Sequence, residues 1–120
     1  MQLLIKHGYL PTIMPEASII YAFTALRQYP RSEKYGLASD TKAAMYELLR
    51  LIVICNKKYY KKTTIQELDT QLDIIRSFVR MAHRMQYINF KKYEIWTARL
   101  DEIGRMIGGW AKANQVHGNK

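Results

Sequence analysis

The sequence predicts an all-α protein built as an up-down bundle of four helices, and three observations lead to this fold class. Apolar residues recur at alternating steps of three and four in four separate segments, which is the spacing of one helix face. Runs of alternating apolar and polar residues, typical of strands, do not extend beyond a few positions. The segments are joined by short connections, which favour antiparallel packing of neighbouring helices. We expect one bundle domain over residues 15–113, with an N-terminal arm before it (residues 1–14) and a disordered tail after it (residues 114–120).

The first helix is predicted over about residues 15–28. Pro15 stands near its first turn, where a missing backbone amide is tolerated because it would have no helical partner. The helix must end near Tyr29, since Pro30 pushes the residue before it out of helical geometry. The apolar face comprises Ile19, Ile20, Phe23 and Leu26.

A second helix is predicted over about residues 40–59, after a polar connection that carries turn chemistry at Gly36. Either Ser39 or Asp40 is a suitable N-cap, because a short polar side chain accepts from the free amides of the first turn. The apolar stripe of this helix is wide, which suggests burial against both the bundle and a second subunit. Cys55, the single cysteine, lies in an apolar run and is expected to be a small buried residue in a reducing cytoplasm. The stripe comprises Ala44, Met45, Leu48, Leu49, Leu51, Ile52, Ile54 and Cys55.

The third helix, over about residues 65–87, has the clearest pattern in the sequence because its apolar positions keep a seven-residue repeat. Thr64 and Glu67 match a capping box at its start. Acidic residues precede basic ones along this helix, an order that complements the helix dipole. The repeat comprises Ile65, Leu68, Leu72, Ile75, Val79 and Ala82.

The last helix is predicted over about residues 90–113, with Asn89 as its N-cap. Gly104 and Gly108 share one face of it, although glycine costs about 1 kcal/mol relative to alanine inside a helix. We expect a neighbouring helix to pack closely against both glycines; the alternative is fraying near the C-terminus. Trp110, at the end of the apolar face, is a third candidate for helix or subunit packing. This face comprises Tyr93, Trp96, Leu100, Ile103, Ile107 and Trp110.

The residue types that usually carry catalysis or bind metals are not clustered in this sequence. His7, His83 and His117 each lack a second ligand at a metal-binding spacing. There is no glycine-rich phosphate loop between a strand and a helix. Asp101 and the carboxylate after it diverge on a helix surface, and Asp101 is placed to pair with Arg105 four residues later. We therefore expect neither catalytic activity, nor a metal, nor a cofactor.

Net charge is the unusual property of this chain, at +9 with a pI of about 9.7. An excess of this size favours an anionic partner, either a nucleic acid or a membrane surface. The alternative is a merely basic protein without such a partner. No apolar run is long enough to span a bilayer. A nucleic acid is the preferred partner, and no membrane is expected.

Arg76, Arg80 and Arg84 form a ridge along the third helix at successive four-residue steps. Like charges at this spacing repel one another, so an outside group is expected to compensate them, either phosphates or the carboxylates of a partner. The alternative is that carboxylates of the bundle itself compensate them, namely Glu47, Glu94 or Glu102.

Lysines gather at two further places, both at predicted helix ends. The first is the lysine corner, residues 57–62, in which Tyr59 and Tyr60 separate two lysine pairs; the second is the start of the last helix. Flexible ammonium groups make good nonspecific phosphate contacts and tyrosines stack on bases, so both places are candidates for RNA binding. A solvated loop is the alternative at each. The candidate lysines are Lys57, Lys58, Lys61, Lys62, Lys91 and Lys92.

Three stretches of the sequence resemble one protein family. They are residues 29–37 (YPRSEKYGL), residues 72–82 (LDIIRSFVRMA) and residues 93–110, which close with LDEIGRMIGGW. In this order they resemble the four-helix-bundle family that contains the Avd accessory proteins of diversity-generating retroelements and the proteins encoded in 23S rRNA intervening sequences. The last stretch is most similar to the Avd branch, and the likeness covers about residues 15–113.

The resemblance implies a homopentameric barrel of bundles whose basic surface binds the reverse transcriptase of the retroelement and its RNA, with DNA as a further partner. It implies no catalytic residues, because such proteins act as scaffolds while the transcriptase copies a template repeat with errors at adenines. Arg76, Arg80 and Arg105 fall in the matching stretches and are expected to be functional or interface positions. Two alternatives stay open: an rRNA-associated intervening-sequence protein, and a helical oligomerisation module that binds an acidic protein.

Overall fold

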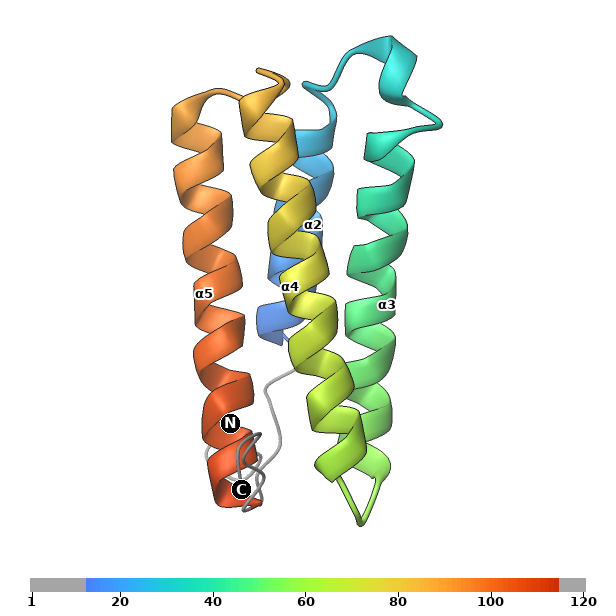
Figure 1. Cartoon of the computed structure of the whole chain (residues 1–120), viewed down its shortest axis with the longest axis vertical. Helices are drawn as coiled ribbons and strands as arrows, with labels where there is room; N and C mark the ends of the chain where they lie inside the picture. The colour runs from blue at the N-terminus through green and yellow to red at the C-terminus, as the bar shows by residue number, and fades with distance from the viewer. Residues whose placement is uncertain (1–12, 115–120) are drawn as a thin grey trace.

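The computed structural model describes residues 13–114, and the regular structure within this range is entirely helical (Figure 1). Its elements are α2 (Ile13–Leu26), a short 3-10 helix η1 (Arg31–Glu33), α3 (Leu37–Lys57), α4 (Lys62–Arg84) and α5 (Phe90–Ala113). The predicted all-α four-helix bundle is confirmed. Residues 1–12 of the predicted arm and residues 115–120 of the predicted tail lie outside the described residues.

The four helices form a ring in which each packs on two neighbours: α3 lies against α2 and α4, and α5 lies against α4 and α2. In Figure 1, α2 and α4 rise while α3 and α5 descend, so successive helices are antiparallel. One end of the bundle therefore carries the α3–α4 turn and the C-terminus of α5. The other end carries η1 and the α4–α5 connection.

The core is built mainly from the predicted apolar faces, but Ile20, predicted to lie on the apolar face of the first helix, is 66% exposed. Every residue of the predicted repeat in α4 is buried, and so is the predicted face of α5 except Tyr93, which is half-buried. Trp96 is the largest fully buried side chain. Full burial of a large apolar side chain contributes about 1.5–3 kcal/mol, so these two faces account for much of the stability of the bundle. Cys55 is also fully buried, as predicted, and burial raises the pKa of its thiol.

The start of α3 differs from the prediction. The helix begins at Leu37, earlier than residue 40, and neither Ser39 nor Asp40 caps it. Instead Glu33 of η1 folds back, and its Oε1 accepts a hydrogen bond from the Leu37 amide at 2.8 Å. A Cβ on Gly36 would lie 2.6 Å from that oxygen, so a side chain at this position would push the carboxylate out of its place.

Glu33 also reaches the end of α4. The Tyr87 hydroxyl donates to its second oxygen, Oε2, at 2.8 Å. The Tyr87 ring packs on the buried ring of Tyr29, with 5.4 Å between the ring centroids. The Leu37 amide, and then the Tyr87 hydroxyl, lower the pKa of the Glu33 carboxyl. One carboxylate thereby joins η1, the start of α3 and the α4–α5 connection.

The start of α4 also lies earlier than predicted. The helix begins at Lys62, and the Lys61 carbonyl accepts from the Ile65 amide at 2.8 Å. The predicted capping box at Thr64 and Glu67 is therefore wrong, because Thr64 lies inside the first turn and is buried. The chain enters the helix sooner than a local capping rule predicts.

The end of α4 is a Schellman motif, a pattern in which the two residues after the C-cap donate back to the last turn of the helix. The Tyr87 amide donates to the Ala82 carbonyl at 2.8 Å, and the Gln86 amide donates to the His83 carbonyl at 3.0 Å. Gln86 adopts the left-handed conformation that this motif requires, with φ of 64°. This turn ends α4 at Arg84, before the predicted residue 87.

The outer helices lie close to their predicted positions. The bounds of α5 agree with the prediction, and the Asn89 side chain caps it by accepting from the Lys92 amide at 2.8 Å. The first helix, α2, begins and ends about two residues before the predicted range, with Pro15 in its first turn as expected.

Replacing Tyr87 with phenylalanine should make the free energy of unfolding change less between neutral and acidic pH. The pKa of Glu33 in the folded protein lies below its ordinary 4.5, so its ionised form stabilises the fold above that pH and this stabilisation is lost as pH falls through the lowered pKa. Tyr87→Phe removes one cause of the lowered pKa. Urea unfolding at neutral pH and at about pH 3.5 measures the difference. Tyr60→Phe, at an exposed tyrosine, is the control, and an unchanged pH dependence in Tyr87→Phe would contradict the role of this contact.

Candidate nucleic-acid and protein interface

The arginine ridge of α4 begins against α5. Arg76 is half-buried there, and its Nη1 donates to the carboxylate of Asp101. The two side chains are 29% and 44% exposed, so the pair contributes about 1 kcal/mol or less. Asp101 is not one of the three carboxylates that the sequence suggested as partners for the ridge. Because it pairs with Arg76, the predicted surface pair of Asp101 with Arg105 is wrong.

Gly104 gives Arg76 room to reach α5. A Cβ on Gly104 would lie 2.7 Å from Nη2 of Arg76 and 3.3 Å from Cδ2 of Leu72. Side chains of α4 therefore lie directly against Gly104, while the predicted close packing of a neighbouring helix backbone stays a prediction. Gly108 differs, since a Cβ there would meet no described atom within 4 Å, so packing against another subunit stays a prediction. Trp110 is buried in the core of the bundle itself.

Arg80 and Arg84 continue the ridge without a carboxylate partner among the described residues. Both are exposed, and Arg80 donates from Nη2 to the hydroxyl of Ser77 at 3.0 Å, which leaves its charge uncompensated. A small hollow of about 40 Å³ lies between α4 and α5, lined by Arg80 and Tyr93 among others. The His83 ring stacks on Tyr93 at 4.3 Å between centroids. This α4–α5 face thus presents guanidinium groups beside stacked aromatic rings.

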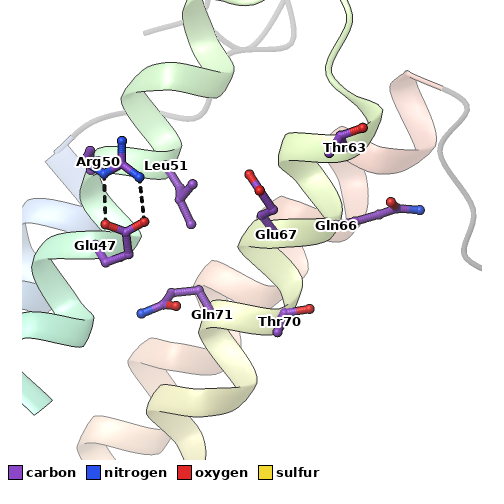
Figure 2. Close-up of a pocket in the computed structure, with 8 residues that line it drawn as sticks. All are labelled: Glu47, Arg50, Leu51, Thr63, Gln66, Glu67, Thr70 and Gln71. Atoms are coloured by element: carbon purple, nitrogen blue, oxygen red, sulfur yellow. Dashed lines mark hydrogen bonds and ion pairs between the residues drawn. The ribbon is translucent and has the colours of Figure 1, made fainter. Parts of the chain in front are cut away.

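Glu47 lies on the α3 side of α4, whereas the ridge begins on the α5 side. It borders a polar groove of about 420 Å³ between α3 and α4, where two hydrogen bonds of 2.9 and 2.8 Å join it to Arg50 (Figure 2). Gln71 of α4 also lines this groove and donates to the Ala44 carbonyl of α3 at 3.0 Å. The ion pairs of residues 13–114 involve neither Glu94 nor Glu102. None of the three expected carboxylates therefore compensates the ridge.

The lysine corner forms the turn between α3 and α4, and Lys61 has a structural role in it. Its Nζ donates to the carbonyl of Cys55 at 2.6 Å and to that of Lys58, and it lies 5.5 Å from the Trp110 ring. It thereby satisfies carbonyls at the C-terminus of α3. The two tyrosine rings of the corner meet edge to face at 4.7 Å. The exposed members of the corner are Lys57, Lys58, Tyr59, Tyr60 and Lys62.

Lys91 and Lys92 lie in the first turn of α5, at the opposite end of the bundle from the lysine corner. Cations in a first turn oppose the helix dipole, so these lysines do not serve the stability of the helix. Arg84, at the end of α4, is at the same end of the bundle. Arg105 is exposed on α5 and belongs to no ion pair of the described residues. The structure therefore divides the predicted cations between two ends and one lateral face.

Sequence reasoning missed a further group of cations around η1. Arg27, Arg31, Lys34 and Lys42 line a cavity of about 680 Å³ between α2, η1 and α3. These residues come from several elements, and no spacing rule connects them. The stretch at residues 29–37 pointed to this connection through family resemblance, but it indicated no chemistry.

The part of the chain that the structure describes contains neither a membrane-spanning helix nor a cluster of metal ligands. None of its helices is both long and apolar enough to cross a membrane. Residues 13–114 also contain no group of three or more His, Cys, Asp or Glu side chains that could hold a metal ion. His83 has aromatic neighbours, Tyr93 and Phe90.

A family model described as bAvd-like matches residues 12–114, a range that includes every described helix. This chain belongs to the bAvd-like family. Membership confirms the resemblance seen in the sequence and makes the chain an Avd-type accessory protein at the level of the family. Searches of curated proteins and of solved structures find no match.

Alanine substitutions at two glycines of α5 should separate two effects on stability: the contact between Gly104 and Arg76, and the higher helix propensity of alanine. Gly109→Ala meets no described atom within 4 Å and should stabilise this bAvd-like protein by about 0.5–1 kcal/mol. Gly104→Ala should be less stable than Gly109→Ala by about 1 kcal/mol, because its Cβ displaces Arg76 from Asp101. Urea unfolding measures both variants. The difference should shrink in an Arg76→Ala background, and equal gains at the two glycines would contradict the account.

Proposed function

We propose that this bAvd-like protein is the non-catalytic accessory subunit of a diversity-generating retroelement and acts in the cytoplasm. It assembles as a homopentamer, binds the reverse transcriptase together with the template RNA and its cDNA, and supports mutagenic reverse transcription. The observation that carries the proposal is the α4–α5 face, where Arg80 and Arg84 have no carboxylate partner among the described residues. The family match supplies the retroelement as the biological context.

The chemistry of this face suits an anionic partner. The guanidinium groups of Arg80 and Arg84 offer planar forks that bind phosphate or carboxylate in a bidentate manner. Lys91 and Lys92 add two ammonium groups at the same end of the bundle as Arg84. Phosphates of RNA, or carboxylates on the reverse transcriptase, would compensate charges that the bundle itself leaves open.

Exposed apolar residues on α4 and at its C-cap support self-association. Ile74, Met81 and Met85 are 39%, 47% and 51% exposed, and their spacing places them on one helix face together with half-buried Phe78. A contiguous exposed apolar patch usually marks a protein contact. The wide stripe of α3, by contrast, is used largely inside the bundle, where Met45 is fully buried. Five copies around one axis would multiply the positive field of each subunit and so attract RNA.

Charge reversal on the ridge should separate an RNA site from a protein interface. Arg80→Glu and Arg84→Glu should each weaken binding of RNA or of the reverse transcriptase about tenfold or more, because an attractive charged contact becomes repulsive. Fluorescence anisotropy measures RNA binding, and a pull-down measures transcriptase binding.

Lys112→Glu is the matched control, since it reverses an exposed cation near the C-terminus of α5. Loss of RNA binding alone would assign the ridge to RNA, and loss of transcriptase binding alone would assign it to protein. Retention of both at control levels would contradict the function proposed for the α4–α5 face.

RNA affinity should also fall steeply with salt concentration. If each of five subunits contacts two phosphates, counterion release gives a log–log slope of about −7 on single-stranded RNA, whereas one subunit alone would give about −1.4. Anisotropy titrations from about 50 to 300 mM salt measure the slope. Analytical ultracentrifugation in the same buffers reports the oligomeric state. A flat salt dependence would count against electrostatic recognition.

An rRNA-associated intervening-sequence protein is the second candidate within the same fold family. The bAvd-like match favours the retroelement, because it selects the Avd branch. Gene position distinguishes the two candidates: a reverse transcriptase gene beside this one supports the retroelement, while a position inside an rRNA gene supports the alternative.

A further inference from the structure

The cavity between α2, η1 and α3 combines apolar, aromatic and basic groups. At about 680 Å³ it has the size of a small-ligand pocket. Leu26 is buried in its wall and Phe23 is half-buried, while Tyr35 is 86% exposed. The cationic residues that line it are Arg27, Arg31, Lys34 and Lys42.

The four cations have no compensating carboxylate. Glu33 is close in sequence, but its two oxygens accept from the Leu37 amide and the Tyr87 hydroxyl. The ion pairs of residues 13–114 involve none of the four cations. Residues 1–12 and 115–120 contain no Asp or Glu at all. The cavity therefore carries a local excess of positive charge.

Aromatic rings position two of these cations without neutralising them. The Lys42 ammonium lies 5.3 Å from the centre of the Phe23 ring, which itself meets Tyr46 edge to face at 5.7 Å. The Lys34 ammonium lies 5.5 Å from the centre of the Tyr35 ring. Cation–π contacts of this kind hold an ammonium in place and leave its charge available to an anion.

The first turn of α3 adds backbone donors to the same cavity. Ala38 and Ser39 line it, and they stand at the second and third positions of a 21-residue helix. No side chain caps this helix at Gly36, and the Glu33 carboxylate takes only the Leu37 amide. The amides of Ala38 and Ser39 find no acceptor among the described residues. Free amides at a helix start favour a bound anion.

We propose that this cavity binds one unpaired nucleotide of a single-stranded RNA. The phosphate contacts the four cations and the first turn of α3, and the base stacks on Tyr35. Inorganic phosphate would use the cations but not the exposed ring, whereas a nucleotide uses both. The proposal rests on the proposed function for the presence of RNA, and it adds a second RNA site on the α2–α3 side of the bundle, away from the α4–α5 face.

Substitution of Tyr35 tests the stacking contact. Anisotropy is measured with a short labelled single-stranded RNA and with the duplex of the same sequence. Tyr35→Leu should weaken single-strand binding about fivefold or more and leave duplex binding unchanged, because only an unpaired base is free to stack. Tyr35→Phe is the matched control, which keeps the ring and should bind as the unchanged protein does. Circular dichroism confirms folding, which we expect because Tyr35 is 86% exposed.

Crosslinking tests the location. RNA carrying 4-thiouridine is crosslinked to the full chain, and mass spectrometry should find crosslinks within residues 27–42. AMP should compete with these crosslinks, and inorganic phosphate at the same concentration should not. Competition by phosphate as strong as that by AMP would overturn nucleotide recognition, and the absence of crosslinks in residues 27–42 would overturn binding of an RNA strand in this cavity.

The two proposals fail in different ways. If the unchanged protein binds no RNA, the proposed function loses its RNA partner and the cavity proposal falls with it. If the unchanged protein binds RNA, but Tyr35→Leu binds like Tyr35→Phe or the crosslinks lie only on α4 and α5, the cavity proposal alone is overturned.

Discussion

The buried seam between α4 and α5 is the constraint on which the charged surface depends. Apolar positions of the seven-residue repeat must face inward, so a residue's place on the helix is set relative to this seam. Each step of four residues turns about 40° around a helix. Arg76 therefore borders the seam and meets Asp101, while Arg80 and Arg84 rotate progressively toward solvent. The same periodicity that builds the core delivers two uncompensated guanidinium groups to the surface.

At the ends of the helices, some charged side chains form hydrogen bonds that stabilise the fold, and others stay uncompensated. Lys61 is used by the fold, because its ammonium closes the C-terminus of α3. Glu33 is used as well, because it holds the start of α3 and Tyr87 in the α4–α5 connection. When a carboxylate is occupied in this way in a chain of net charge +9, nearby cations such as Arg31 and Lys34 stay uncompensated. The positive potential of the η1 cavity is thus a consequence of how the bundle is closed.

Local patterns predicted the interior better than the helix starts. The apolar faces of α4 and α5 and the Asn89 cap were predictable because they depend on residues three or four positions apart. The predicted caps at Ser39 and Thr64 are wrong, because Glu33 captures the Leu37 amide and α4 already begins at Lys62. The partner of Asp101 could not be predicted from local patterns either, because Arg76 lies 25 residues away in sequence.

The sequence by itself determined the fold class, most residues of the core, the excess of positive charge and the family to which the chain belongs, because periodicity and composition are properties of the chain alone. Only the tertiary structure decided which charges compensate one another. Arg76 lies 25 residues from Asp101 in sequence and reaches it because Gly104 leaves room on the neighbouring helix. The cavity around η1 arose in the same way, since packing of α2 against α3 gathers cations that no sequence spacing relates.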